Sequence, residues 1–342
     1  MCGIVAVTGY KKALPLLMNG LEKLEYRGYD SAGIAIVNSE TKNIICNKAE
    51  GKLKNLIKNL NDKNMPGTVG IGHTRWATHG KPEIKNAHPH TNSSGTIAVV
   101  QNGIIENFQD LKNKLQKEGV IFNSDTDTEV IPHLIQRELN TLSKLNLDKN
   151  GSTLLVAVRN VISDLEGSYA LAVLWADAPT ALVVARRQAP LIIGLGEGEF
   201  ICASDTPAIA NFTNIILPME DEEIALLTPL GIEIYDSNNE RQYRSPVSLK
   251  VSEQIMDKMN FKHFMLKEIY DQPETAKNWL KNYLIKNLES GQYQINYPFD
   301  TKFFESIERI EIIACGTSKH AAMVGSFLLE QFSGIPTNVF YA

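Results

Sequence analysis

The second residue of the chain and the apolar run behind it constrain the fold most. Cys2 is followed by Gly3 and by apolar residues at 4–7, which predicts a strand over 3–8 that carries the cysteine on a rigid element. Because Cys2 is small, we expect Met1 to be removed, leaving a thiol and a free α-amine on one terminal residue. The pKa of such an amine is about 7.7–8.0 and that of a thiol about 8.5. The amine can therefore accept the thiol proton, directly or through one water, so one residue supplies a nucleophile and its base. An ordinary cysteine at a frayed terminus is the alternative, and these first residues leave both open.

Composition and charge narrow the class of protein. The 342 residues are enough for two domains, and 43% hydrophobic with 21% charged residues is typical of a soluble globular protein. A net charge of −5 without a basic block argues against a nucleic-acid surface or a membrane face. No apolar run approaches the roughly 18 residues of a membrane span, and the N-terminus lacks the pattern of a signal peptide.

Cysteine and histidine spacing bears on metals and compartment. The cysteines, Cys2, Cys46, Cys202 and Cys315, lie far apart without a CxxC pair, so neither a zinc site nor a disulfide framework is predicted. We expect a reducing cytoplasm and no metal or organic cofactor. Four histidines suggest a metal cluster at first glance, but no carboxylate or cysteine joins them at ligand spacing, so we favour structural or loop roles: His73, His79, His88 and His90.

Hydrophobic patterning predicts an α+β fold over about the first 235 residues. Strands are predicted from β-branched runs bounded by Gly, Asn or Asp, at 3–8, 33–37, 69–73, 96–101, 169–174, 181–185 and 224–227. Helices are predicted at 13–24, 107–118, 128–139 and 154–165, with Asp127 as the N-cap of the third. Two stacked sheets flanked by helices follow from this order.

The composition changes near residue 237. The polar stretch 237–247 is typical of a linker. Apolar residues at helical spacing follow, namely Ile255, Met259, Phe264 and Ile269, and we expect Pro273 to start or break a helix that continues to about residue 288.

A new unit opens near Arg309. A buried strand at 310–314, a tight turn at 315–318, a helix at 319–331 and a strand at 338–341 predict the opening β-α-β of a doubly wound domain. The turn residues Cys315, Gly316, Thr317 and Ser318 precede a helix N-terminus, a natural phosphate seat. Because a parallel sheet must be covered on both faces, we expect this unit to be incomplete. More chain, a partner, or poor order of this tail would each account for that.

Several strings carry a resemblance to a known family. They are YRGYDSAG at 26–33, HTRWATHG at 73–80, NGIIEN at 102–107, TDTEV at 126–130 and FMLKEI at 264–269. The terminal Cys-Gly-Ile is shared by N-terminal-nucleophile amidotransferases in general. Together with CGTS at 315–318, the strings resemble the glutamine–fructose-6-phosphate aminotransferase family over all 342 residues, although chains of that family are much longer.

The resemblance implies an architecture. Residues 2–240 would form a four-layer αββα N-terminal-nucleophile sandwich, the glutaminase domain. Residues 241–300 would form a linker with helices, and 301–342 the truncated start of a sugar isomerase (SIS) domain. The parent reaction transfers ammonia from glutamine to fructose 6-phosphate, and we expect this chain to keep the glutaminase half. The resemblance also implies a homodimer at full length, and a sugar-phosphate site at Cys315, Gly316, Thr317 and Ser318.

The resemblance assigns roles in the glutaminase site. Cys2 would be the nucleophile, with its amine as base and later acid, and the Asn102 side chain and Gly103 N–H would hold the oxyanion. A planar guanidinium such as Arg75 suits the glutamine α-carboxylate, and Asp127 suits its α-ammonium group. The remaining residues would close over glutamine or position it: Trp76, Thr78, His79 and Arg27.

Three simpler readings exist for these residues. Arg75 and Trp76 could form a surface cation–π pair, Asn102-Gly103 between apolar runs is ordinarily a hairpin turn, and Asp127 could be only a helix cap. Two positions depart from the family: Gln101 stands where histidine is usual, and Lys319 where an aromatic is usual.

Rival functions remain at this point. A glutaminase serving another acceptor, such as phosphoribosyl diphosphate, is one. A regulatory fragment that binds glutamine and a partner is the other.

Overall fold

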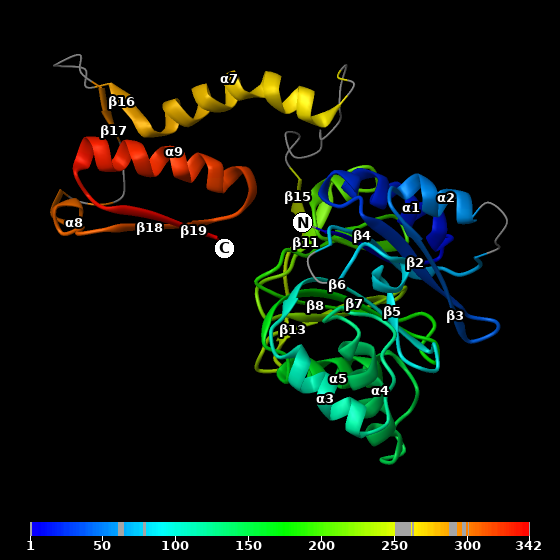
Figure 1. Ribbon diagram of the computed structural model, residues 1–342. Helices are drawn as coiled ribbons and strands as arrows, with labels where there is room; N and C mark the ends of the chain where they lie inside the picture. Colours follow the sequence, from blue (N-terminus) through cyan, green and yellow to red (C-terminus); the bar gives the residue numbers. More distant parts are fainter. Residues whose placement is uncertain are drawn as a thin grey trace. The chain divides into compact units, whose positions relative to one another are not determined.

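The computed structural model describes residues 2–60, 65–77, 80–249, 261, 263–286, 293–295, 299 and 301–341. The chain divides into two compact units, Met1–Asp257 and Lys258–Ala342. In the first unit, two antiparallel sheets are stacked between two layers of helices (Figure 1).

The first sheet, sheet 1, contains β1, the strand that directly follows Cys2, among its inner strands. Its eight strands run in the order β15-β11-β9-β10-β1-β4-β2-β3. β1 is buried along its whole length because helices cover one face of this sheet and the second sheet covers the other. The bounds are β1 Gly3–Gly9, β2 Ser31–Asn38, β3 Asn43–Glu50, β4 Val69–Arg75, β9 Ile192–Leu195, β10 Glu199–Ala203, β11 Ile215–Pro218 and β15 Val247–Ser248.

The second sheet, sheet 2, faces β1 and β4 of sheet 1 through its strand β6. Its seven strands run in the order β14-β13-β12-β8-β7-β6-β5. The bounds are β5 His90–Thr91, β6 Ile97–Ile105, β7 Gly167–Trp175, β8 Leu182–Arg187, β12 Ile224–Thr228, β13 Gly231–Tyr235 and β14 Arg241–Gln242.

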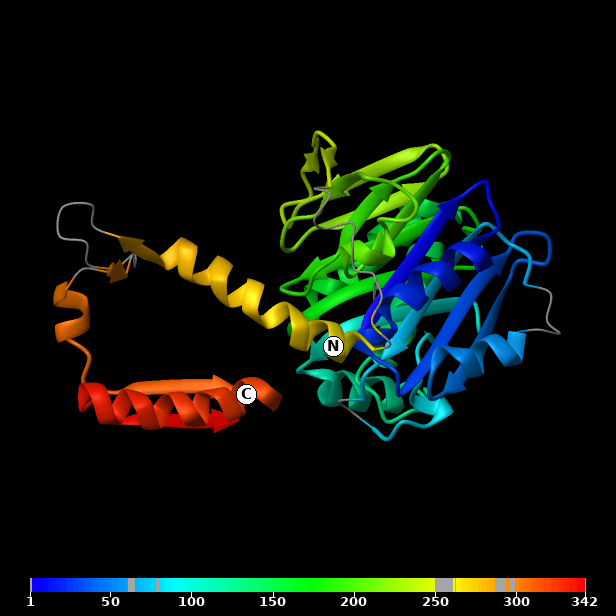
Figure 2. The ribbon, with the colours of Figure 1, turned by 90° about the horizontal axis from the view of Figure 1, so that it is seen from above.

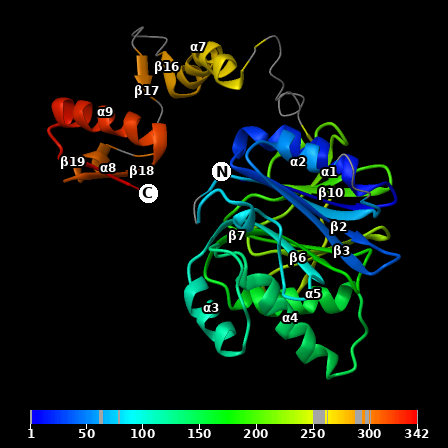
Figure 3. The same cartoon turned by 45° about the vertical axis from the view of Figure 1, so that its right-hand side comes forward.

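Figure 3 shows the two sheets between α1–α2 on one side and α3–α5 on the other. Three apolar cores lie between these four layers. One core lies between the two sheets, one between sheet 1 and α1–α2, and one between sheet 2 and α3–α5. The predicted αββα sandwich is therefore confirmed for this unit. The helices are α1 Ala13–Leu24, α2 Leu53–Leu60, α3 Phe108–Lys117, α4 Val130–Ser143 and α5 Gly151–Ser163, with short 3-10 turns η1 Glu25–Arg27, η2 Ile84–Asn86 and η3 Thr206–Ala208.

Glycines in β4 let α1 approach sheet 1 closely. A Cβ added at Gly70 would lie 2.9 Å from Leu17 of α1, and one at Gly72 would lie 2.9 Å from Leu21. Figure 2 looks onto the α1 and α2 side of this sheet. The leucines of one helix face thus fill the space that the glycines leave, which fixes the strand that ends at Arg75.

The predicted elements of this unit are present, with shifted ends. All seven strands and all four helices exist, and α1 has the predicted bounds. The third helix begins at Val130 rather than at residue 128, because Glu129 and not Asp127 occupies its N-cap position. Asp127 as N-cap was therefore wrong.

The polar stretch 237–247 is not a free linker. It contains β14, which pairs with β13, and leads into β15, which pairs with β11. Arg244 between them forms an ion pair with the buried Glu223, with 2.5 Å between Nη2 and Oε1. The first unit therefore continues past the boundary at residue 240 that the sequence suggested.

The second unit contains a long helix and a parallel pair of strands. α7, Phe264–Tyr283, carries Pro273 in its interior, so the expectation that this proline starts or breaks a helix was wrong. Proline removes one backbone hydrogen bond, and the bonds on either side keep the helix continuous. Of the residues predicted at helical spacing before it, Ile255 and Met259 lie outside the described residues.

The end of the chain forms the predicted β-α-β. β18 Ile310–Ala314 and β19 Thr337–Tyr341 pair in parallel, joined by α9 Gly316–Ser333. The other elements of this unit are β16 Leu284–Lys286, β17 Tyr293–Ile295 and α8 Thr301–Glu305. Among the helices of the described residues, none combines the length and the apolar character that crossing a membrane requires.

Candidate functional site

Cys2 lies at the end of β1, where β4 brings the Trp76 backbone to its thiol. Sγ accepts the Trp76 N–H at 3.2 Å and lies 3.4 Å from the Trp76 carbonyl oxygen, to which it can donate. Burial raises the pKa of this thiol, while the Trp76 N–H and the charge of Arg75 oppose that rise. The thiol is therefore protonated at rest and needs a base to become a nucleophile.

Asn102 and Gly103 reach the same point from the other sheet. The Asn102 Nδ2 donates to the Cys2 carbonyl oxygen at 3.2 Å. Both residues lie inside β6, whose pairing with β7 continues to Ile105, so the hairpin-turn reading was wrong. Gly103 has φ of +107°, and a Cβ there would lie 2.1 Å from the Ser168 carbonyl oxygen. Only glycine fits this backbone, which is exposed while most of β6 is buried.

Arg75 ends β4 and is 4% exposed, so it is not half of a surface cation–π pair. Its Nη1 and Nη2 donate to the carbonyl oxygens of Lys81 and Gly80, each at 3.3 Å. Burial lowers the pKa of the guanidinium, and the charges of Cys2, Asp30 and Asp127 oppose that change. The cation thus lies near Cys2 and Asp127, which the sequence assigned to the same site, and near Asp30.

Asp127 is tied to the end of β6. Its Oδ2 accepts the Ile105 N–H at 2.8 Å, and the residue is 5% exposed. Neighbouring hydroxyls fix the same segment, because Thr126 Oγ1 lies 3.1 Å from His90 Nε2 and Thr128 Oγ1 donates to Gln101 Oε1 at 2.6 Å. The carboxylate is therefore held in place by sheet 2 rather than by a helix terminus.

Arg27 and Trp76 flank the thiol in different ways. Arg27 forms an ion pair with Asp205, whose Oδ2 lies 2.5 Å from Nη1, and Asp205 also accepts the Tyr26 hydroxyl at 2.8 Å. Trp76 is 44% exposed, and its ring meets Tyr29 edge-on with 5.5 Å between centroids. Thr78 and His79 lie outside the described residues.

Three of the four histidines that suggested a metal cluster, His73, His88 and His90, lie together between the sheets, and His79 lies outside the described residues. The rings of His73 and His88 stack with 4.2 Å between centroids, and His90 meets His88 edge-on at 4.8 Å. Among the described residues, no group of three or more His, Cys, Asp or Glu side chains is arranged to hold a metal ion. The imidazoles bond to protein instead: His88 Nδ1, for example, accepts the Gln101 N–H at 3.2 Å.

Sequence reasoning missed two residues that build the site. Asp30 accepts the Ala77 N–H at 2.9 Å and so orients the chain after Arg75. His73 bonds to Asn102, with 3.0 Å between Nε2 and Oδ1. Both lie inside the family strings at 26–33 and 73–80, and this was the sequence signal that could have identified them as site residues.

The residues predicted to hold sugar phosphate belong to the second unit. Cys315 is the N-cap of α9, and Gly316, Thr317 and Ser318 form its first turn rather than a separate turn. Lys319 stands where the family usually has an aromatic residue, and its Nζ lies over the Tyr341 ring.

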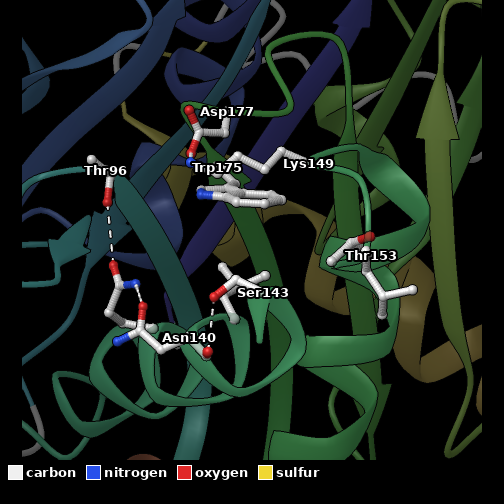
Figure 4. A pocket seen from close by; sticks show the side chains of 10 residues that line it. Thr96, Asn140, Ser143, Lys149, Thr153, Trp175 and Asp177 are labelled. Atoms are coloured by element: carbon white, nitrogen blue, oxygen red, sulfur yellow. Dashed lines mark hydrogen bonds and ion pairs between the residues drawn. The ribbon is translucent and has the colours of Figure 1, made fainter. Parts of the chain in front are cut away.

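A small pocket at the opposite end of β6 is a weaker candidate (Figure 4). It measures about 120 Å³ and is lined by Thr96, Trp175 and the ion-paired Lys149 and Asp177, among others. Its polar groups already satisfy one another, since Gln136 Nε2 donates to Asn140 at 2.8 Å. Nothing in this lining calls for a ligand.

Comparison with known proteins agrees with this geometry. Residues 73–211 match the family model of the glutamine amidotransferase domain. The fold is similar to that of a glutamine phosphoribosylpyrophosphate amidotransferase from B. subtilis, with a TM-score of 0.60 and 22% identity, covering 99% of this chain and 65% of that one. A second solved structure, described as the allosteric regulatory enzyme of purine biosynthesis, has a TM-score of 0.61 and 21% identity, covering 99% and 80%. The fold is that of N-terminal-nucleophile amidotransferases, and the chain contains a glutamine amidotransferase domain.

Sequence relatives narrow the family. The chain is 50% identical to a glutamine–fructose-6-phosphate aminotransferase (isomerizing) of Thermosynechococcus vestitus, over 100% of this chain and 54% of the relative. It is 47% identical to the enzyme of the same name from Aquifex aeolicus, over the same shares of each chain. The chain belongs to the glutamine–fructose-6-phosphate aminotransferase family, and it spans about half the length of these relatives.

Proposed function

We propose that this chain hydrolyses glutamine to glutamate and ammonia at Cys2, once Met1 has been removed. The observation that carries the proposal is the meeting of two sheets at one point. The thiol comes from the end of β1, and the Asn102 amide of β6 lies 3.2 Å from the Cys2 carbonyl oxygen. Nucleophile and oxyanion donor thus sit on rigid elements rather than on loops.

The chemistry begins with proton transfer within one residue. The α-amine of Cys2 takes the thiol proton, and Sγ attacks the side-chain carbonyl carbon of glutamine. The tetrahedral oxyanion receives hydrogen bonds from Asn102 Nδ2 and the Gly103 N–H. The protonated amine then gives its proton to the departing nitrogen, which leaves as ammonia, and a γ-glutamyl thioester remains. A water activated by the same amine hydrolyses the thioester and releases glutamate.

Recognition of glutamine uses the two buried charges beside the thiol. Arg75 offers a planar fork to the α-carboxylate, and its bonds to the carbonyl oxygens of Gly80 and Lys81 are long at 3.3 Å, so a carboxylate can compete for the guanidinium. Asp127 offers a carboxylate to the α-ammonium group. Trp76, Thr78 and His79 would cover the bound substrate, and Arg27 would position the site through its charge.

A protein of the relatives' full length would contain about twice as many residues as this chain. We propose that it uses the ammonia to convert fructose 6-phosphate to glucosamine 6-phosphate, as the names of the relatives suggest, with the phosphate at Cys315, Gly316, Thr317 and Ser318. We also propose that this protein forms a homodimer and that it is located in the cytoplasm, where its free cysteines stay reduced.

Glutamate release by the purified chain tests the function, with and without fructose 6-phosphate. Release that is lost in Cys2→Ala supports the glutaminase assignment, and release by Cys2→Ala refutes it. No release from a chain shown by mass spectrometry to begin at Cys2 would favour a regulatory fragment instead. The remaining rival function is a glutaminase that serves another acceptor, and it is tested by offering phosphoribosyl diphosphate as the acceptor.

A further inference from the structure

His73 is a buried imidazole that the proposed mechanism does not yet use. It lies in β4 opposite Ile4 of β1 and is 1% exposed. Its Nε2 lies 3.0 Å from Asn102 Oδ1 and 3.2 Å from the Gln101 carbonyl oxygen. Because a carbonyl oxygen can only accept, Nε2 carries the hydrogen and acts as donor to both groups.

This donor decides which way the Asn102 amide faces. With Oδ1 toward His73, Nδ2 faces the Cys2 carbonyl oxygen, and both contacts pair a donor with an acceptor. The flipped amide would set Nδ2 against the His73 N–H and Oδ1 against the Cys2 carbonyl oxygen. Both contacts would then be repulsive, so the two neighbours select the same orientation independently. One Nδ2 hydrogen goes to Cys2, which leaves the second for a substrate oxygen.

We propose that His73 is a positioning residue for glutamine hydrolysis: its Nε2–H holds the Asn102 amide with Nδ2 toward Cys2, so that the oxyanion donor is set before the substrate arrives. The inference rests on the proposed function, because it takes Asn102 as an oxyanion donor.

The surroundings keep His73 in the form that this role needs. Burial lowers the pKa of the imidazole to about 3, and the nearby Arg75 cation acts in the same direction. The ring is therefore neutral near pH 7, with one hydrogen, which the acceptors at Nε2 place there. Its stack on His88, at 4.2 Å and 15° between planes, fixes the ring plane. His73 thus places no charge beside the oxyanion site and still offers its Nε2–H as a donor.

Substitutions at His73 separate positioning from packing. We expect His73→Phe to lower kcat for glutamate release at least about fivefold, the effect of one neutral hydrogen bond. The loss should stay below the ~10²–10³-fold cost of removing an oxyanion donor outright, and KM should stay within about twofold. His73→Gln should keep most of the rate, because its amide nitrogen can take the place of Nε2. If His73→Phe does not fold, His73→Met removes the same donor at similar volume.

His133→Phe is the matched control. It replaces another buried imidazole, on α4, whose ring meets Phe122 edge-on. We expect it to lower the melting temperature without changing kcat. A kcat for His73→Phe equal to that of this control would overturn the inference.

A double-mutant cycle gives the sharper test. If His73 acts through Asn102, then His73→Phe should change kcat by less than about twofold when Asn102 is already alanine. Additive losses would overturn the positioning role while leaving the proposed function intact. If Asn102→Ala alone kept the full kcat, the oxyanion assignment in the proposed function would itself be refuted, and the inference with it.

Discussion

Gly103→Ala tests whether the backbone at the end of β6 is part of the site. The φ of +107° is a conformation that alanine adopts only at a cost, and the new Cβ would lie 2.1 Å from the Ser168 carbonyl oxygen. That oxygen belongs to β7 and cannot move without disturbing its pairing with β6. Strain of this kind costs about 2 kcal/mol, which corresponds to a fall of roughly 4–8 °C in melting temperature for a unit of this size.

The same change should cost activity beyond its effect on stability. A shift of the Gly103 N–H removes one oxyanion donor, so we expect kcat for glutamate release to fall ~10²–10³-fold. Steady-state glutamate release, measured well below the melting temperature, separates this loss from unfolding.

Gly95→Ala is the matched control for Gly103→Ala. Gly95 also has a positive φ, +70°, but no atom lies within 4 Å of the position of its Cβ. It precedes β6, at the opposite end of the strand from Asn102. We expect it to lose about 1 kcal/mol of stability and to keep its full kcat. If both variants lost the same stability and kept the same kcat, the reasoning about Gly103 would be refuted.

Three further predictions follow from the same structure. Arg75→Lys should raise the KM for glutamine severalfold, because a point charge replaces a fork, and an unchanged KM would remove Arg75 from carboxylate binding. Burial lowers the pKa of His73 to about 3 and lowers that of His88 as well. The unfolded chain then binds more protons below about pH 6.5, so the urea midpoint should fall as pH drops from 6.5 toward 3, and a midpoint that rises would contradict the burial of neutral rings. Arg244→Met should lower the free energy of unfolding by about 3 kcal/mol, because it leaves the buried Glu223 without its cation. If this variant unfolded at the wild-type melting temperature, the stabilising role of the ion pair would be contradicted.

The sequence predicts the central elements of the first unit well. Each is buried either on one face or on all sides, and such burial leaves a clear pattern of apolar residues. The run after Cys2 and the helix at 13–24 have patterns that only a buried strand and an amphipathic helix produce. The two-residue strands β14 and β15 have no such pattern. Their polar residues pair because β13 and β11 offer open edges, which is tertiary information.

The site could be predicted in its residue types but not in all its geometry. Asn102-Gly103 suits both a hairpin turn and a strand with one positive φ, because glycine serves either, and the pairing with β7 decides between them. Asp127 suits a helix cap by spacing alone, yet the nearby Ile105 N–H takes its carboxylate. The roles assigned to Arg75, Trp76, Thr78, His79 and Arg27 stay predictions until substrate binding is measured.

The central claim is that Cys2 acts with its own amine as base. The direct test compares glutamate release by two forms of the chain, one beginning at Cys2 and one in which Met1 is retained, each verified by intact mass. Both keep the thiol and the residues around it, and they differ in Met1, whose peptide bond takes the place of the free Cys2 amine. The account predicts turnover only in the form that begins at Cys2. Equal turnover by the two forms would contradict it, because the base would then have to be another group.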